Sequence, residues 1–469
     1  MRLLPLSTGS ILRPKLLCRS SDSVKRIRKR LDAMADDAQD FYHRELETLD
    51  RHSIVALQRE RLGRLLEELE SNRFYQEKFR LAGLEMRSIR SAEDLRRLPF
   101  TTKSELIAEQ QTHPPYGRLL TYSPARYRYF HQTSGTTFQP MKWLDTSEDW
   151  ESWMRCWGHV YRGAGVSDDD VVFCAFSFGP YISHWAAIEG ARHIGALCVS
   201  GGGLSSEQRL RLMRNNHCTV LVCTPTYALH LGEVAEALGL DLRRSDIRTT
   251  IHAGEPGASV PNVRRRIEDC WGARSFDHAG ATEVGAWGFD CQVEDGSIHL
   301  NELEFIFEVV DPRTGETIEP GTRGELVATN LGRAGMPLLR YRTGDLVELI
   351  LDPCACGRGM TRIRGGVLGR ADDMLIVRGV NMYPSAIDNL VRGLPSIVEF
   401  EVEIRRRDGM DDLLLKLEVR DSEHFSEAER VVLAAFRSQF NIRVSVEQAA
   451  RGSLPRYEFK ARRYKRIAG

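Results

Sequence analysis

The run Val171-Val172-Phe173-Cys174-Ala175-Phe176 decides the fold class, because an unbroken apolar run of this length is typical of a buried strand. Further apolar runs at 196–199, 219–223 and 249–253 predict more strands, and helical patterns separate them. Strands that alternate with helices predict an α/β domain with a mostly parallel sheet. Ligands of such sheets bind at the carboxyl ends of the strands.

The pattern changes twice further along the chain. Predicted strands over 305–310 and 324–329 flank a turn at 311–315, which indicates a small antiparallel β subdomain. A second change near Gly369 predicts a separate α+β lobe. The elements expected in that lobe are a hairpin over 399–404 and 413–419, a helix over 426–440 and a strand over 442–446.

Composition excludes several classes of protein. The chain has 469 residues, which is too long for one core, and its 65 basic residues balance 65 acidic ones. No global field therefore favours nucleic acid, and no apolar run is long enough to cross a membrane. The ten cysteines are scattered, several of them in apolar runs, as is typical of reduced cytoplasmic thiols. We expect a cytoplasmic protein that binds neither nucleic acid nor a membrane.

Residues 1–33 differ from the rest because they are strongly basic. A transit peptide has this composition, but no small-residue cleavage site or long apolar core is visible. We expect a disordered extension rather than a targeting signal. An upstream start codon, with Met34 as the first residue, would explain the segment equally well.

The hydroxyl-rich run Thr133-Ser134-Gly135-Thr136-Thr137 precedes Phe138-Gln139-Pro140. Such residues bury little apolar area and compete with the backbone for hydrogen bonds, so the run is a poor packing element. Glycine allows close approach of the backbone, and the amides and hydroxyls then direct several donors at one anion. By itself the run fits either a phosphate-binding loop or a polar surface loop.

Four later stretches are the candidates for partners of this loop. Glu283, in the stretch Asp277–Glu283, suits Mg²⁺, which prefers oxygen ligands. Asp345 follows a glycine turn and is suited to accept hydrogen bonds from ribose hydroxyls. The remaining two stretches are 369–379, at the domain change, and 454–460, which contains Lys460.

In this order and spacing, the set resembles the adenylate-forming superfamily of acyl-CoA synthetases, luciferases and peptide-synthetase adenylation domains. The branch that it resembles most is that of the phenylacetate–coenzyme A ligases. The resemblance extends over about residues 40–467. It includes short stretches of similar sequence at 42–50, 199–202, 223–229, 337–343 and 378–385.

The resemblance implies a role for each matching residue. The triphosphate would be bound by Thr133, Ser134, Gly135, Thr136 and Thr137. The rest of the nucleotide would be bound by Gly254, Glu255, Asp277, Asp345 and Arg370. Thr282 would contact the α-phosphate, Glu283 would bind Mg²⁺, and Lys460 would bridge the α-phosphate and the substrate carboxylate. Asp372 would be the hinge of a mobile C-terminal domain, and Gly379 would open the path of the thiol.

These roles divide the chain and give its chemistry. We expect an extension over 1–33, an adenylation domain over 34–368, a hinge over 369–373 and a C-terminal domain over 374–469. A carboxylate attacks the α-phosphate, and Mg²⁺, the phosphate loop and Lys460 offset the repulsion between the two anions. Rotation about the hinge would then remove Lys460 and admit coenzyme A.

A zinc site is also implied. Cys291, His299, Cys354 and Cys356 would supply three thiolates and one imidazole to a structural Zn²⁺, as in members of this branch. The spacing alone leaves open a pair of buried thiols in a turn, since two residues between cysteines are more usual than one.

The chain departs from the family pattern at two places. Phe138 and Gln139 stand where the family has glycine and lysine, and Ala279 stands where it usually has a tyrosine that stacks on adenine. The effect of both changes on ATP binding and loop closure is left open.

The acyl pocket is expected along 176–188 and near His252 and Gly254, where Phe178, Tyr181 and Trp185 would suit an aromatic acid. The leading hypothesis is an ATP-dependent ligase that joins an aryl or arylacetic acid to coenzyme A. An alternative acceptor is a carrier protein, an amine or a small nitrogen nucleophile such as nitrite. A third reading, a catalytically weak nucleotide sensor, is disfavoured by Glu283, Asp345 and Lys460. Whether the protein is a homodimer is left open.

Overall fold

The computed structural model describes residues 41–133, 140–293, 296–371, 373–377, 380–407, 410–457 and 460–467. The predicted extension over 1–33 lies outside these residues. Three cores are present among the described residues: two lie in the part of the chain before Gly369 and one in the part after it.

The chain enters through a helical segment that packs against the main core. The helices of this segment are α2 (Arg44–Glu47), α3 (Arg51–Glu68), α4 (Arg73–Leu81), α5 (Ala92–Leu95) and α6 (Lys103–Thr112). Asp50 begins α3, because its side chain accepts a hydrogen bond from the Ser53 amide. Thr102 begins α6 as part of a capping box with Glu105. This capping box fixes where α6 starts, and therefore where Lys103 is placed.

A β-hairpin and a long helix come next. The hairpin pairs β1 (Tyr127–Gln132) with β2 (Lys142–Thr146) in antiparallel register. Its connection holds the hydroxyl-rich run, of which Ser134, Gly135, Thr136, Thr137, Phe138 and Gln139 lie outside the described residues. Helix α7 (Ser147–Gly163) starts directly after β2, at a capping box of Thr146 and Asp149.

The parallel strands form half of one large sheet, in the order β4-β3-β5-β6-β7. Their bounds are β3 (Val171–Cys174), β4 (Leu197–Ser200), β5 (Val220–Cys223), β6 (Thr249–His252) and β7 (Arg274–Ala281). The helices between and after them are α8 (Ile182–His193), α9 (Ser206–Asn215), α10 (Pro225–Ala237) and α11 (Pro261–Trp271). The strands and helices predicted from the apolar runs are confirmed, with bounds that differ by one or two residues.

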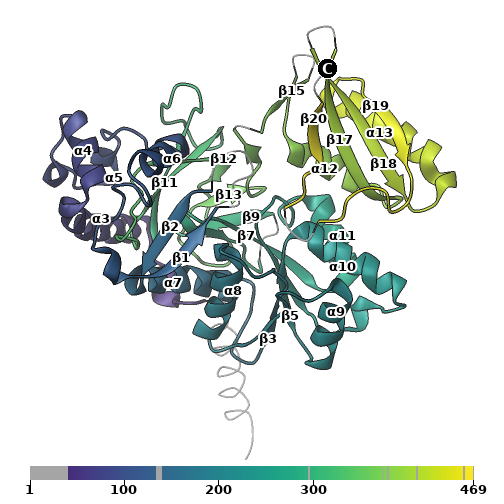
Figure 1. Ribbon diagram of the computed structural model, residues 1–469, viewed down its shortest axis with the longest axis horizontal. Helices are drawn as coiled ribbons and strands as arrows, with labels where there is room; N and C mark the ends of the chain where they lie inside the picture. The colour runs from purple at the N-terminus through teal and green to yellow at the C-terminus, as the bar shows by residue number, and fades with distance from the viewer. Residues whose placement is uncertain are drawn as a thin grey trace, which may run out of the picture.

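Both faces of the parallel strands are covered by helices (Figure 1). Val172 and Cys174 belong to the same core as α7 and α8, whereas Phe173 packs with residues of α9, α10 and α11. Neighbouring residues of β3 thus point to opposite cores, because side chains alternate along a strand. This explains the unbroken apolar run: a strand that is buried on both faces has no solvent-facing position.

The antiparallel strands continue the same sheet. Strand β7 pairs in parallel with β6 and antiparallel with β8, so the hydrogen bonding passes from one half to the other without a break. The antiparallel half is β8 (Gly285–Phe289), β9 (Ser297–Leu300), β10 (Phe305–Val310), β11 (Arg323–Asn330), β12 (Tyr341–Ile350), β13 (Arg362–Arg364) and β14 (Gly369–Arg370). The predicted β subdomain is therefore an extension of the parallel sheet rather than a sheet of its own.

The C-terminal domain is a second sheet with helices. Its elements are β15 (Leu375–Val377), β16 (Val380–Met382), α12 (Pro384–Arg392), β17 (Ile397–Arg407), β18 (Met410–Val419), α13 (Phe425–Phe440), β19 (Ser445–Ala449) and β20 (Tyr464–Ile467). The predicted hairpin and the helix over 426–440 are confirmed. The last predicted strand begins three residues later than expected, because Asn441 ends α13 in a left-handed conformation and Ile442 is buried in the connection.

The C-terminal domain sits against α11 and α10 of the large domain, on the right in Figure 1. Asn262 of α11 hydrogen-bonds to Asn389 of α12, and Arg266 donates to the carbonyl of Ile397 at 3.0 Å. Among the described helices, none has both the length and the apolar character needed to cross a membrane.

Candidate active site

A cavity of about 510 Å³ lies at the carboxyl ends of the parallel strands. Thr224 follows β5, Gly254 follows β6 and Thr282 follows β7, and all three line the cavity. The C-terminal domain closes it with Arg456, Tyr457, Lys460 and Arg462. Two domains thus share one cavity, and its volume is ordinary for a small-molecule site.

Lys460 of the C-terminal domain reaches the strand end at Gly254. A Cβ atom on Gly254 would lie 3.6 Å from Lys460 Cε, so the lysine stem runs over this glycine, whose φ of +96° suits a residue without a side chain. The lysine is exposed to the cavity but surrounded by protein. Burial lowers its pKa, Arg370 lowers it further, and the carboxylates of Asp345 and Glu255 act in the opposite direction.

Glu283 is held firmly next to Thr282. Tyr341 donates to Glu283 Oε1 at 2.8 Å, and Lys103 Nζ lies 3.8 Å from the same oxygen. Burial and then the Glu283 carboxylate raise the pKa of Tyr341 well above its usual value, so the phenol remains a donor. The carboxylate therefore has a fixed orientation, and its oxygen atoms are of the type that Mg²⁺ prefers.

The backbone of this turn has its own support. Arg333 Nη1 donates to the carbonyls of Thr282 and Glu283 at 3.2 and 3.0 Å. Arg333 Nε donates in turn to Asp145 Oδ1 at 2.8 Å, and both side chains are buried. A buried ion pair thus fixes the turn that carries two predicted catalytic residues.

Asp345 and Arg370 are brought together by strand pairing. Their strands, β12 and β14, place them opposite one another, and Arg370 Nη1 donates to Asp345 Oδ1 at 3.1 Å. Gly344 leaves room for the guanidinium, since a Cβ there would lie 2.5 Å from Arg370 Nη2. The structure thus groups these two predicted nucleotide-binding residues near Lys460.

Other predicted nucleotide ligands have different surroundings. The buried carboxylate of Asp277 accepts hydrogen bonds from the amide and hydroxyl of Ser259, and Asp277 does not line the cavity. The carboxylate of Glu255 accepts from the amides of Thr226 and Ala461. For these two residues the role inferred from the sequence stays a prediction.

Thr133 closes the hairpin that carries the hydroxyl-rich loop. Its amide donates to the Met141 carbonyl, and its hydroxyl accepts from the Met141 amide, both at 3.0 Å. The loop therefore starts and ends at one fixed point. Asp372 and Gly379, like Ser134–Thr137, lie outside the described residues, and their predicted roles stay predictions.

Aromatic side chains of the large domain also line the cavity. Trp153 and Trp157 of α7 line it together with Phe176, Tyr181 and His278. Burial lowers the pKa of His278 to about 4, so its ring is neutral near pH 7. The two tryptophans are not among the residues predicted for the acyl pocket, although their spacing on one helix face signals a shared environment.

The expected acyl-pocket residues are only partly those found. Tyr181 lines the cavity as expected. Phe178, which precedes α8, and Trp185, in its first turn, do not, and they are 56% and 39% exposed. His252 is fully buried within the sheet and does not line the cavity. Ala279, where the family's tyrosine was expected, is buried beside Gly288 and is also absent from the lining.

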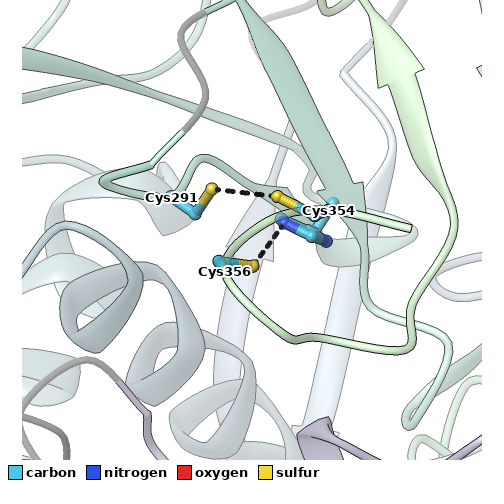
Figure 2. A group of neighbouring side chains, drawn as sticks. Cys291, Cys354 and Cys356 are labelled. Atoms are coloured by element: carbon cyan, nitrogen blue, oxygen red, sulfur yellow. Dashed lines mark hydrogen bonds between the residues drawn. The ribbon is translucent and has the colours of Figure 1, made fainter. Parts of the chain in front are cut away.

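A second cluster lies in the antiparallel half of the sheet (Figure 2). The ligand atoms of Cys291, His299, Cys354 and Cys356 all lie within 4.8 Å of one another. Cys291 Sγ is 3.8 Å from Cys354 Sγ, and Cys356 Sγ is 3.4 Å from His299 Nε2. A tetrahedral zinc site has sulfur–sulfur edges of about 3.8 Å and sulfur–nitrogen edges of about 3.6 Å. The donor set and its spacing therefore fit zinc.

Comparison with known proteins assigns this architecture to a class. Residues 60–333 match the family model described as AMP-binding enzyme, and residues 379–465 match the AMP-binding enzyme C-terminal domain. A phenylacetate–coenzyme A ligase of Thermus thermophilus is 34% identical over 81% of this chain and 85% of its own length. One of Escherichia coli K12 is 30% identical over 89% of this chain and 95% of its own length.

The chain therefore belongs to the family of AMP-binding enzymes. Within it, the predictions of a phenylacetate–coenzyme A ligase-like member and of an AMP-forming acid–thiol ligase are confirmed, as is the predicted fold class.

The orientation of the C-terminal domain also has a match. A structure of 2-hydroxyisobutyryl-CoA ligase in the postadenylation state, with R3-HIB-AMP bound, has a TM-score of 0.86 over 91% of this chain and 92% of its own, at 29% identity. The same ligase in the thioesterification state has a TM-score of 0.68 over 90% of this chain and 91% of its own, at 29% identity. Over nearly the same share of this chain, the similarity is therefore higher to the postadenylation structure of that ligase than to its thioesterification structure.

Proposed function

We propose that this ligase activates an aryl or arylacetic acid with ATP and passes the acyl group to coenzyme A. The observation that carries the proposal is the shared cavity, which Lys460 and Thr282 line together with the aromatic side chains of Trp153, Trp157 and Tyr181. An acid with an aromatic ring would bury the ring against these side chains while its carboxylate reaches the lysine.

Electrostatics supports the first step of this proposal. A carboxylate and the α-phosphate repel one another, and the Lys460 ammonium would lie between the two anions. Glu283 would hold Mg²⁺, which supplies further positive charge when it is bound. Asp345, fixed by Arg370, would accept hydrogen bonds from the ribose. Glu283 and Asp345 each have a contact that sets the orientation of the carboxylate before substrate arrives.

The Cys291/His299/Cys354/Cys356 cluster would hold a structural zinc. All four ligand positions would be occupied by protein, which is typical of a structural rather than a catalytic site. The role of the metal would be to tie β8 and β9 to the connection between β12 and β13. The cytoplasmic location stays a prediction, and so do the homodimer and the carrier-protein partner.

The test offers the purified protein ATP, Mg²⁺ and a panel of acids, with and without coenzyme A. The panel contains benzoate, phenylacetate, their ring-substituted forms and small aliphatic acids such as 2-hydroxyisobutyrate. Acid-dependent pyrophosphate release, with a thioester identified by mass only when coenzyme A is present, is the expected result for the aromatic acids. A preference for the aliphatic acids would contradict the proposed substrate class. Pyrophosphate release without thioester would direct the search to another acceptor.

A further inference from the structure

Glu255 joins the two domains beside Lys460. It follows β6 in the large domain, and its Oε1 accepts a hydrogen bond from the Thr226 amide at 3.0 Å. Thr226 lies in the first turn of α10, where backbone amides have no partner within the helix and the helix dipole favours a negative charge. This contact fixes the carboxylate to the large domain.

The other oxygen of Glu255 reaches the C-terminal domain. Oε2 accepts from the Ala461 amide at 2.7 Å, and Ala461 is the residue directly after Lys460. A hydrogen bond to this amide restrains the backbone from which the lysine side chain extends. The lysine stem then runs over Gly254, the residue directly before Glu255.

We propose that Glu255 is a positioning residue: it holds the backbone beside Lys460 in place for adenylation, and this hydrogen bond breaks when the C-terminal domain rotates. The inference rests on the proposed function. Because Ala461 moves with the C-terminal domain, the bond to Glu255 exists only in the orientation seen here. The carboxylate therefore stabilises one of the two orientations and not the other, which is the condition for shifting the equilibrium between them.

Other contacts cross the same interface, and one of them gives a control. Arg456 Nε donates to Glu233 at 2.7 Å, with both side chains partly buried. Arg420 pairs with Glu236, but these side chains are 49% and 61% exposed, and exposed ion pairs contribute little. The substitution Glu236→Ala therefore removes a negative charge from the same interface without removing a contact to the backbone beside Lys460.

The experiment measures the two half-reactions separately in Glu255→Ala, Glu255→Gln and Glu236→Ala. Adenylation follows acid-dependent pyrophosphate release, and thioesterification follows conversion of a supplied acyl-adenylate with coenzyme A. We expect Glu255→Ala to lower kcat for adenylation by about 10- to 100-fold, since hydrogen bonds to a charged acceptor are worth this much. KM for ATP and the second half-reaction should be unchanged. Glu236→Ala should change neither half-reaction.

Glu255→Gln keeps the shape of the side chain, so its defect is not a folding defect. One amide oxygen can still accept a hydrogen bond, but the amide nitrogen would face a second donor. A loss intermediate between wild type and Glu255→Ala is expected. In a Lys460→Ala background, Glu255→Ala should cause no further loss of adenylation, since the two residues act as one unit.

Two kinetic results would overturn the inference. A raised KM for ATP with unchanged kcat would make Glu255 a nucleotide ligand. Equal losses in both half-reactions would make it merely structural.

Hydrogen exchange separates this inference from the proposed function, because it needs no turnover. The peptide that contains the Ala461 amide should exchange faster in Glu255→Ala than in Glu236→Ala. Unchanged exchange would overturn the positioning role even in an active enzyme. Faster exchange would support it even if the acid panel released no pyrophosphate.

Discussion

The Lys460 cavity and the Cys291/His299/Cys354/Cys356 cluster both gather residues from distant parts of the chain, but they are built differently. Lys460 comes from the second domain, charges of the large domain act on it, and the amide of the next residue, Ala461, donates to Glu255 across an interface that opens in the proposed mechanism. The cluster lies within the large domain, where His299 is buried in β9 and Cys291 is buried just after the end of β8. A group that takes part in one of two steps has to be removable, whereas a structural ligand set has to be permanent.

The largest expected effect is that of removing the Lys460 ammonium group. Lys460→Ala should lower the rate of adenylation by roughly 1,000-fold or more, because the ammonium stabilises charge that develops in the transition state. Thioesterification of a supplied acyl-adenylate should stay within about threefold of wild type. Rapid-quench assays of each half-reaction measure both. Lys465→Ala is the control, since that lysine pairs with Glu401 on the C-terminal sheet. Equal loss in both half-reactions would contradict the assignment.

The second prediction concerns the Cys291/His299/Cys354/Cys356 cluster. Cys356→Ser should lower the free energy of unfolding by roughly 3 kcal/mol or more, because structural zinc binding contributes directly to folding. For a domain of roughly 330 residues that is about 4 °C in the midpoint of thermal unfolding. Metal content is measured by mass spectrometry, with Cys270→Ser as the control for loss of a thiol outside the cluster.

A strong chelator should lower the midpoint of the wild type by a similar amount and leave that of Cys356→Ser unchanged. A wild-type protein that carries no zinc, and unfolds at the same temperature as Cys356→Ser, would refute the metal site.

The third prediction sharpens the picture of the cavity. Tyr181→Ala should lower kcat/KM for aromatic acids by about 10- to 100-fold, because loss of one buried aromatic contact costs on the order of 1.5–3 kcal/mol. Acids without a ring should be affected less. Phe178→Ala is the matched control, since this ring is nearby but does not line the cavity. If both variants lose activity equally on all acids, the aromatic wall is not what binds the ring.

The smallest expected effect is a shift in pH dependence. In the proposed mechanism the protonated form of Lys460 is the active one, and burial lowers its pKa below 10.5. Adenylation should therefore decline as the pH rises, with a midpoint below 10.5, while thioesterification shows no such decline. Glu255→Gln should move this midpoint to lower pH, because a nearby carboxylate that favours the charged lysine is lost. A midpoint that stays in place would mean that another group titrates.

Local sequence was sufficient for the elements with strong patterns. The run at 171–176 is apolar throughout because both faces of β3 are buried, and it therefore predicts a strand. The alternation of strands and helices downstream predicts that the strands are parallel. It was not sufficient for the continuity of the sheet. Strand β7 pairs with β6 on one side and β8 on the other, and this depends on contacts between strands rather than on the pattern within one.

The same division holds for the candidate site. The motifs around Thr282, Asp345 and Lys460 are visible in the sequence because their residue types suit the chemistry. Trp153 and Trp157 have no such motif, since an aromatic helix face is as typical of a core as of a ligand pocket. Arg333 is further from any pattern, because its role comes from two carbonyls about fifty residues away.

The sequence by itself determined the class of this protein: the strand and helix alternation, the ordered motifs and the Cys–His set are properties of residue type and spacing. Only the tertiary structure decided what Glu255 and Arg333 contact, which aromatic rings form the acyl wall, and how the C-terminal domain meets α10. The physical reason is that periodicity and motif chemistry are local along the chain, whereas a hydrogen bond between domains depends on how two separately folded surfaces are packed together.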